Sequence, residues 1–343
     1  MFQGNSPSSQ RIPVTIITGF LGSGKTTLLN NIIRQHHGLR FAIIENEFGE
    51  MGIDGDLLDS VDGPMFELVN GCICCSLHND FYKALQLIIE KQSHIDHLLV
   101  EATGIADPLC VVDVFMANET ISNHFVVDSV ICVANANDIE EILDSESEAR
   151  KQIAVADLVL LNKIDMVRRD HISTLRQLIS GINPMTKILE TTFAHTNGTP
   201  LLQTHAYSHR HVEATTLSFD NINLSLQDVA SDVQGRLARA AHRHDIHAEG
   251  FVFDGCFDLE MFNIWMASYL YFNQQSLYRV KGILNFKGKR KKFVFQAVKG
   301  SYIFEEGNEW KEGETPFSKI VFIGKFLNRK ELENNLCKLL QKR

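Results

Sequence analysis

Hydrophobic residues in the first half of the chain form short runs separated by segments with helical spacing. Residues 14–18 form a β-branched run, and after residue 25 the apolar positions recur every three or four residues. Further apolar runs lie at 41–44, 98–100, 126–133 and 158–161, and the segments expected to be helices include 81–91 and 171–182. Strands that alternate with helices predict an α/β domain with a mostly parallel sheet and helices on both faces.

The pattern changes after residue 198. Residues 199–247 are rich in His, Ser, Thr and Asn and poor in apolar side chains, so we expect a linker there. Strand-like runs then follow at 250–253, 277–286, 292–298 and 320–326, with helical patterns at 259–272 and 329–340. Consecutive strands with helices at the ends predict a smaller α+β domain. The expected organisation is a first domain at 11–198, the linker, and a C-terminal domain at 248–343.

Length and composition agree with two globular domains. The chain has 343 residues, and domains average ~150 residues. No apolar run reaches the ~18 residues of a membrane helix, and residues 1–10 lack the apolar stretch of a secretion signal, so we expect a cytoplasmic protein with no membrane partner. The net charge of -9 argues against nucleic acid as a partner, because phosphate backbones are bound by clustered Lys and Arg.

The clearest motif lies between the first expected strand and the first expected helix. It fits the pattern G-x-x-x-x-G-K-[ST], in which backbone amides surround the phosphates at a helix N-terminus. Lys25 should bridge the β- and γ-phosphates, and the Thr26 hydroxyl should ligate Mg²⁺. The residues expected to bind the nucleotide here are Gly19, Gly22, Ser23, Gly24, Lys25, Thr26 and Thr27.

A second motif indicates which base is bound. Asn162, Lys163 and Asp165 directly follow an apolar strand, at the sheet edge where ligands bind in open α/β folds. The Asp165 carboxylate can accept hydrogen bonds from N1 and N2 of guanine. Adenine offers no such pair, and a buried carboxylate left unpaired would cost ~2–5 kcal/mol. We therefore expect GTP and GDP as the nucleotides.

A third motif, Glu101-Ala102-Thr103-Gly104, follows another apolar strand. Glu101 can hold Mg²⁺ directly or through water, and the Gly104 amide can sense the γ-phosphate. The expected mechanism is positioning and charge neutralisation by Lys25, Thr26, Glu101 and Gly104 while an ordered water attacks. The sequence contains no obvious general base.

Three thiols lie close together at Cys72, Cys74 and Cys75. Thiolates favour soft or borderline metals such as Zn²⁺, Cu⁺ or Co²⁺. We expect Zn²⁺, with Co²⁺ or Ni²⁺ as alternatives. In an extended segment Cys72 and Cys74 share one face and Cys75 points away, and an inert buried cluster is the other interpretation. The acidic residues from Glu45 to Glu50 could ligate this metal, ligate Mg²⁺ or form a solvated loop.

Half of the 14 histidines lie between residues 195 and 247. The pairs His209 and His211, and His242 and His244, have spacing suited to labile metal capture, and solvated histidines in a linker are the alternative. A basic run, from Lys287 to Lys292, predicts either a hairpin tip with solvated charges or a contact surface for acidic partners.

Together these motifs resemble the CobW-type GTPases, which are metallochaperones related to the nickel-insertion and urease-maturation GTPases. The resemblance rests on G-F-L-G-S-G-K-T-T-L-L, E-N-E-F-G-E, N-G-C-I-C-C, E-A-T-G-I-A-D-P and N-K-I-D, and it covers nearly the whole chain. It implies a SIMIBI-like P-loop GTPase fold with a CobW-type C-terminal domain. It also implies metal contacts from Glu45, Glu50 and Cys74, with Cys72 and Cys75 as neighbouring thiols.

The resemblance also implies where one further ligand would lie. Family members often have a histidine in the segment after the acidic motif, and the matching position here is Asn118, with His124 nearby.

The leading hypothesis is a GTPase that hydrolyses GTP to GDP and phosphate and delivers a transition metal, expected to be zinc, to client metalloproteins. One alternative is a GTP-regulated metal buffer or sensor. Another is a cobalt-handling GTPase of cobalamin synthesis. The partners expected are GTP, the metal ion and a client protein, and a homo-oligomer is an open alternative.

Overall fold

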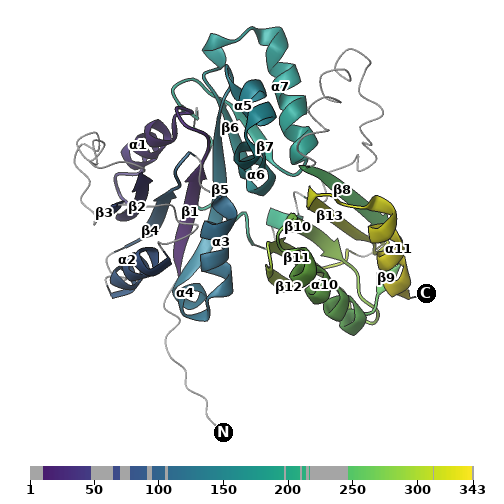
Figure 1. Ribbon diagram of the computed structural model, residues 1–343. Coiled ribbons are helices and arrows are strands. Elements are labelled where there is room, and N and C mark those ends of the chain that lie inside the picture. The colour runs from purple at the N-terminus through teal and green to yellow at the C-terminus, as the bar shows by residue number, and fades with distance from the viewer. Residues whose placement is uncertain are drawn as a thin grey trace.

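The computed structural model describes residues 11–47, 65–69, 78–90, 95–104, 107–196, 198–208, 211–213, 216, 246–311 and 313–341. These residues form an N-terminal domain around a parallel sheet and a C-terminal domain around an antiparallel sheet, and the two domains pack against each other (Figure 1). The predicted fold class, a mostly parallel P-loop GTPase sheet plus a smaller α+β domain, is confirmed.

Seven strands of the described residues form the N-terminal sheet, in the order β3-β2-β4-β1-β5-β6-β7, and every neighbouring pair is parallel. Most of its side chains are apolar and buried on both faces, which is why the strands read as continuous hydrophobic runs. The strands are β1 (Ile12–Thr18), β2 (Phe41–Glu47), β3 (Met65–Val69), β4 (His97–Glu101), β5 (Phe125–Asn135), β6 (Leu158–Asn162) and β7 (Lys187–Glu190).

Helices cover both faces of this sheet (Figure 1). One face packs on α1 (Lys25–Gln35), whose apolar residues recur at helical spacing. The opposite face packs on α2 (His78–Glu90), α3 (Pro108–Ala117), α4 (Glu119–His124), α5 (Ile139–Ser145), α6 (Ser147–Val155) and α7 (Arg169–Ile182). No helix in the described part of the chain combines the length and the apolar character that a membrane span requires.

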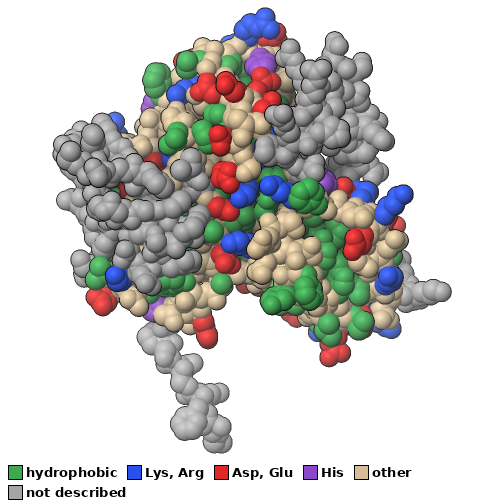
Figure 2. Space-filling view, viewed as in Figure 1, with side chains coloured by type: hydrophobic (Ala, Val, Ile, Leu, Met, Phe, Trp, Pro, Cys, Tyr) green, Lys and Arg blue, Asp and Glu red, His purple; other side chains and the backbone are tan. Residues whose placement is uncertain are grey.

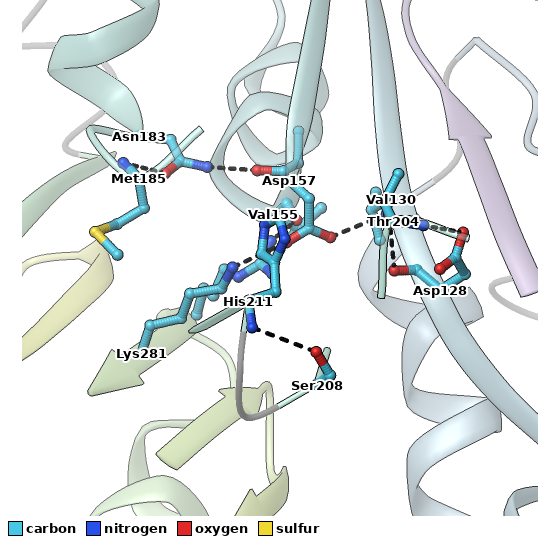
Figure 3. Close-up of polar contacts among 12 residues, drawn as sticks. Asp128, Val130, Val155, Asp157, Asn183, Met185, Thr204, Ser208, His211 and Lys281 are labelled. Atoms are coloured by element: carbon cyan, nitrogen blue, oxygen red, sulfur yellow. Dashed lines mark hydrogen bonds and ion pairs between the residues drawn. The ribbon is translucent and has the colours of Figure 1, made fainter. Parts of the chain in front are cut away.

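The segment expected to be a linker differs from that expectation at its start. Leu201 and Leu202 are buried beside α1, and Ala206 and Tyr207 are buried on the other side of the sheet. The buried Asp128 carboxylate accepts hydrogen bonds from two backbone N–H groups of this segment, those of residues 204 and 205 (Figure 3). The beginning of the polar segment therefore belongs to the packed N-terminal domain.

The C-terminal domain has a five-stranded antiparallel sheet in the order β12-β11-β10-β13-β8. Two helices, α10 (Leu259–Asn273) and α11 (Arg329–Leu339), pack on one face through an aromatic core. The strands are β8 (Ile246–Phe253), β10 (Leu277–Leu284), β11 (Lys291–Val298), β12 (Ser301–Glu309) and β13 (Ser318–Lys325), and β9 (Cys256–Phe257) pairs with β14 (Leu340–Gln341).

The other face of the C-terminal sheet packs against the N-terminal domain. Val298, Val321 and Ile323 join the core cluster that contains α3, α6 and α7. Polar contacts accompany this packing: the Ser301 hydroxyl donates to Asp113 of α3 at 2.7 Å, and Lys281 pairs with Asp157 at 2.9 Å. The domain interface therefore combines apolar packing with buried charge.

Candidate nucleotide-binding site

The loop between β1 and α1 has the backbone geometry that its glycines require. Gly19, Gly22 and Gly24 have φ values of 141°, 70° and 110°, in the region that favours glycine. A β-carbon on Gly19 would overlap the Val133 carbonyl, and one on Gly24 would lie 2.6 Å from Nδ2 of Asn162. The loop is therefore pressed against β5 and β6, with α1 beginning at Lys25 as predicted.

Asn162 braces this loop from the end of β6. Its Nδ2 donates to the Ser23 carbonyl at 3.0 Å, and its Oδ1 accepts from the Thr191 hydroxyl at 3.1 Å and the Ala194 N–H at 2.9 Å. Asn162 is 2% exposed, whereas Asp165 of the same motif is exposed. The geometry thus gives Asn162 a bracing role between the phosphate loop and the base side, while Asp165 is accessible to a ligand.

The loop after β7 is a part of the site that the motifs did not indicate. Phe193 and Ala194 have φ values of 50° and 54°, and the Phe193 ring is exposed beside the Asn162 loop. The Asn31 side chain of α1 donates to the Phe193 carbonyl at 2.9 Å. The signal that could have found this loop is its position at the carboxyl end of a parallel strand, the edge at which such sheets bind ligands.

A magnesium position is built from oxygen donors beside α1. The Thr26 hydroxyl donates to Glu101 Oε1 at 3.2 Å, which joins the helix start to the end of β4. Three nearby buried hydroxyls, those of Thr18, Ser23 and Thr103, have no hydrogen-bond partner among the described residues. Buried hydroxyls in folded proteins are usually paired, so this set fits a site completed by a hydrated Mg²⁺ and phosphates.

Gly104 lies directly against the phosphate loop. A β-carbon on Gly104 would be 2.6 Å from the Leu21 N atom and 2.7 Å from the Leu21 side chain. The residue after β4 therefore packs on the backbone of the P-loop, where the sequence expected an amide that senses the γ-phosphate. Only a glycine fits this contact.

Glutamates follow one another across the edge of the sheet. In the strand register Glu101 pairs with Glu45 of β2, and Glu45 pairs with the backbone position of Glu67 in β3. Glu45 is 8% exposed and shares its sheet face with Ile43, which packs on α1. The backbone register therefore leads from Glu101 at the magnesium position through Glu45 to β3, whose last residue precedes the thiol motif.

Most residues predicted to bind the transition metal lie outside the described residues. These are Glu50, Cys72, Cys74, Cys75, His209, His242 and His244. Within the described ranges, no cluster of three or more His, Cys, Asp or Glu side chains has the arrangement of a metal site. The transition-metal ligands therefore stay predictions.

Asn118 has a helix-capping role. Its Oδ1 accepts from the Ile121 N–H at 3.1 Å at the start of α4. Both Asn118 and His124 precede β5, so they lie at the amino end of that strand. The phosphate loop and Glu101 lie at the carboxyl ends of their strands, which is the opposite edge of a parallel sheet. Neither residue is therefore near the nucleotide position.

His211 lies in the domain interface, half-buried beside the Asp157 carboxylate and the Lys281 ammonium (Figure 3). Burial and the positive charge of Lys281 lower the pKa of His211, although Asp157 acts in the opposite direction. Asp157 also pairs with Arg279, whose guanidinium donates to the Val155 carbonyl and lies over the Tyr207 ring. His211 is thus surrounded by an ion cluster that joins the domains.

The basic run needs one correction. The residues between β10 and β11 do form a hairpin with exposed charges, but Lys292 is 2% exposed. Its ammonium pairs with Glu213 at 2.9 Å and Glu314 at 3.3 Å and lies over the Trp310 ring. The interpretation as solvated charge is therefore wrong at Lys292, because β11 turns that side chain toward the segment that enters from the N-terminal domain.

Comparisons with known proteins bear on the whole chain. Residues 13–190 match the family model described as CobW/HypB/UreG, nucleotide-binding domain, and residues 246–340 match the cobalamin synthesis protein cobW C-terminal domain. The zinc chaperone YjiA of Escherichia coli is 30% identical over 325 residues, covering 94% of this chain and 96% of its own length.

Two further comparisons cover nearly as much. The zinc-regulated GTPase metalloprotein activator 1 of Schizosaccharomyces pombe is 31% identical in an alignment of 346 positions that covers 93% of this chain and 83% of the relative. The crystal structure of Zn(II)-bound YjiA GTPase from E. coli superposes with a TM-score of 0.71 at 25% identity, and covers 97% of this chain and 100% of that one.

Proposed function

The chain belongs to the CobW/HypB/UreG family and is a GTPase, and from this premise we propose that it couples GTP hydrolysis to the delivery of zinc to client metalloproteins. Relatives named as zinc chaperones and as a zinc-regulated metalloprotein activator support zinc as the cargo. We place the transfer in the cytoplasm, because the thiols of Cys72, Cys74 and Cys75 bind metal in their reduced form.

The observation that carries the proposal is the backbone register across β4, β2 and β3. Thr26 touches Glu101, Glu101 is in register with Glu45, and β3 continues at Val69 into the thiol motif. A bound phosphate and a bound transition metal would therefore share neighbouring strands of one sheet. Movement at the strand end beside the phosphate would therefore displace the residues that bind the transition metal.

Hydrolysis is performed by groups that hold the phosphates in place. The backbone amides of the P-loop and the Lys25 ammonium neutralise charge as it develops on the transferred phosphoryl group. The Thr26 hydroxyl and the Glu101 carboxylate would hold Mg²⁺, which would supply further charge neutralisation. The Gly104 N–H faces the third phosphate, and the exposed Asp165 carboxylate selects guanine.

Coupling follows from loss of the third phosphate. Gly104 loses its ligand after hydrolysis, and the segments beside it rearrange, as the switch segments of other GTPases do. We expect this rearrangement to reach the predicted ligands Glu50 and Cys74 and to release zinc. By thermodynamic reciprocity, bound zinc changes the affinity for GTP by the same factor that GTP changes the affinity for zinc.

The decisive experiment compares the wild type with Cys74→Ser and a matched control, Cys337→Ser. Cys337 is an exposed cysteine of α11 in the C-terminal domain, so its loss removes a thiol without touching the motif. GTP hydrolysis and zinc stoichiometry are measured with and without Zn²⁺. We expect Cys74→Ser to lose the tight zinc and the effect of zinc on turnover, and Cys337→Ser to keep both.

Two outcomes would contradict the proposal. If Cys74→Ser keeps its zinc and its zinc response, the thiol motif is not the metal site. If zinc bound to the wild type stays bound through GTP turnover in the presence of an apo acceptor protein, the chain is a GTP-regulated buffer instead of a donor. Metal competition with Co²⁺ in the same assay tests the cobalt alternative.

Base choice has its own test in Asp165→Asn. An amide at this position can donate to the C2 carbonyl of xanthine, whereas it can no longer accept both guanine hydrogen bonds. We expect the preference to move from GTP toward xanthosine triphosphate by roughly 10²-fold or more. An unchanged preference for GTP in competition binding would overturn the assignment of Asp165.

A further inference from the structure

A buried glutamine of α6 contacts Gly104, the residue proposed above to face the third phosphate. Gln152 is 1% exposed, and its Nε2 donates to the Gly104 carbonyl at 3.0 Å. The two residues are 48 positions apart in the sequence, so the contact depends on the tertiary fold. None of the nucleotide-binding motifs contains Gln152.

Gly104 is held by two contacts. The P-loop backbone at Leu21 is the first, so close that a β-carbon on Gly104 would be 2.6 Å from the Leu21 N atom. The Gln152 amide donates to the Gly104 carbonyl and is the second contact. Glycine has the widest conformational freedom of any residue, so its backbone takes one orientation only when outside contacts fix it. Gln152 is the side chain that supplies such a contact here.

The neighbouring residue of α6 holds the far end of the same segment. The Lys151 ammonium lies 3.3 Å from Asp107 Oδ2, and Asp107 Oδ1 accepts from the Leu109 N–H to cap α3. Two successive residues of one helix therefore anchor positions 104 and 107. This arrangement fixes both ends of the segment that begins with Gly104 and ends at the start of α3.

A donor is needed at position 152. The Gly104 carbonyl is a buried acceptor, and an apolar side chain in place of Gln152 would leave it without this partner. A charged side chain at a site with 1% exposure would carry a large desolvation cost. A neutral amide of this length satisfies the carbonyl and avoids that cost.

We propose that Gln152 is a positioning residue for GTP hydrolysis, which rests on the GTPase function proposed above. Its amide holds the Gly104 backbone against the P-loop, where the Gly104 N–H meets the γ-phosphate. Gln152 touches neither phosphate nor water, and acts through Gly104. Because GDP lacks the third phosphate, the contribution of Gln152 appears with GTP and is absent with GDP.

The test is Gln152→Leu, compared with Asn183→Leu as a matched control. Asn183, which Figure 3 labels, is also 1% exposed. Its Nδ2 donates to the carbonyls of Ile153, Ala154 and Ala156 at 2.9–3.1 Å. Its replacement removes buried hydrogen bonds from the end of α6 without touching Gly104. Both variants exchange a buried amide for leucine. They differ in the lost partner, which is the Gly104 carbonyl for Gln152 and the carbonyls at the end of α6 for Asn183.

Affinities for GDP and for the non-hydrolysable analogue guanosine 5′-(β,γ-imido)triphosphate are measured with Mg²⁺, together with kcat and KM for GTP and thermal midpoints. We expect Gln152→Leu to lower kcat and the affinity for the triphosphate roughly tenfold while GDP affinity stays within about twofold. We expect Asn183→Leu to lower the thermal midpoint and to keep the ratio of triphosphate to GDP affinity.

Equal shifts of this ratio in both variants would show that Gln152 merely stabilises α6, and an unchanged ratio in Gln152→Leu would show that it does not position Gly104. Should Gln152→Leu fail to fold, Gln152→Met carries the same expectation with an unbranched side chain. A wild type that binds but does not hydrolyse GTP would overturn the proposed function, yet the binding ratio would still decide the role of Gln152.

Discussion

The two faces of the C-terminal sheet differ in the side chains that they bury: one buries aromatic rings and the other buries charged groups. The face under α10 and α11 is a core of phenylalanines, in which Phe262 packs against Phe257, Phe286 and Phe295. The face toward the N-terminal domain contains buried cations, including Arg279 at 1% exposure and Lys281 at 3%. In Figure 2, hydrophobic side chains gather over the C-terminal domain, whereas Lys and Arg side chains mark its boundary with the N-terminal domain.

The difference teaches which contacts each face needs. Aromatic side chains bury one another within the domain, so that face is complete without the rest of the chain. Arg279 and Lys281 share a single carboxylate, Asp157, which comes from the N-terminal domain. Buried charges are costly without their partners, so the charged face is stable only when the domains are docked. The four predictions below test this contrast, from the largest expected effect to the smallest.

The largest effect is expected from Asp157→Asn. The change leaves two buried cations without their carboxylate, and breaking a buried pair costs about 3–5 kcal/mol, with the upper end expected for two cations. Urea unfolding followed by tryptophan fluorescence measures it, because both tryptophans of the chain, Trp265 and Trp310, lie in the C-terminal domain. The control is Asp144→Asn, which removes an exposed partner of Arg150. Equal losses in the two variants would refute the contrast.

The next effect is expected from Phe262→Ala in the aromatic face. Removing a fully buried phenylalanine costs about 3–5 kcal/mol through lost burial and a cavity. Ser268→Ala changes an exposed residue of the same helix and serves as the control. We expect Phe262→Ala to lower the unfolding midpoint and to keep GDP affinity, since the aromatic face is complete within its domain. A parallel loss of GDP affinity would contradict that independence.

Adjacent lysines of β11 provide the third comparison. Lys292→Met leaves the largely buried Glu213 without its cation and should cost about 3 kcal/mol. Lys291→Met removes an exposed pair with Glu306, and we expect an unchanged midpoint because such pairs are screened by water. Both are measured by the same urea unfolding. If Lys291→Met were the more damaging change, the assignment of Lys292 to the buried face would be wrong.

The smallest effect concerns pH and His211. Burial lowers the pKa of His211 in the docked state, so below about pH 6.5 the undocked chain binds the proton first and docking weakens as the pH falls. The slope from one such group is at most ~1.4 kcal/mol per pH unit. We expect His211→Gln to show a smaller loss of stability than the wild type between pH 7.5 and 5.5.

His97 contributes equally to the pH dependence of stability in the wild type and in His211→Gln. Burial lowers its pKa to about 3, so it also destabilises the fold on acidification. The difference between the wild type and His211→Gln therefore isolates the interface. Identical pH profiles would show that His211 stays uncoupled from docking.

The sequence predicted those parts of the fold that depend on local pattern. Strands such as β1 and β6 are buried on both sides and read as apolar runs, and α7 and α10 begin close to their expected positions. The strand β12 was missed, because an edge strand with mostly exposed side chains has no apolar alternation and is held by backbone pairing with β11. The packing of residues 201–207 was missed because their few apolar side chains lie in a longer segment that is rich in polar residues.

Site residues were predictable where a motif fixes them. The glycines, Lys25 and Thr26 follow from the spacing of the phosphate loop. In the structure the glycines have positive φ values, α1 begins at Lys25, and Thr26 contacts Glu101. Gln152 and the loop at Phe193 carry no motif, because their roles arise from helices and strands that meet only in the folded chain. The burial of Arg279 and Lys281 carries no sequence signal, since it depends on the other domain.

The strand order also determines when each site can form during synthesis. The strand β1 is synthesised first, yet it lies between β4 and β5. Val14 can therefore pair only after Leu98 has been made, and Ile12 only after Phe125 has been made. Pairing between strands so far apart in the sequence is slow, because the entropy cost of closing the long loop comes before the contacts form. Asp157 meets its cations only after residues 279 and 281 have been made. All residues of the nucleotide cradle are therefore synthesised before Arg279 and Lys281, and we expect a nascent chain to be able to bind GTP before Asp157 has its cations.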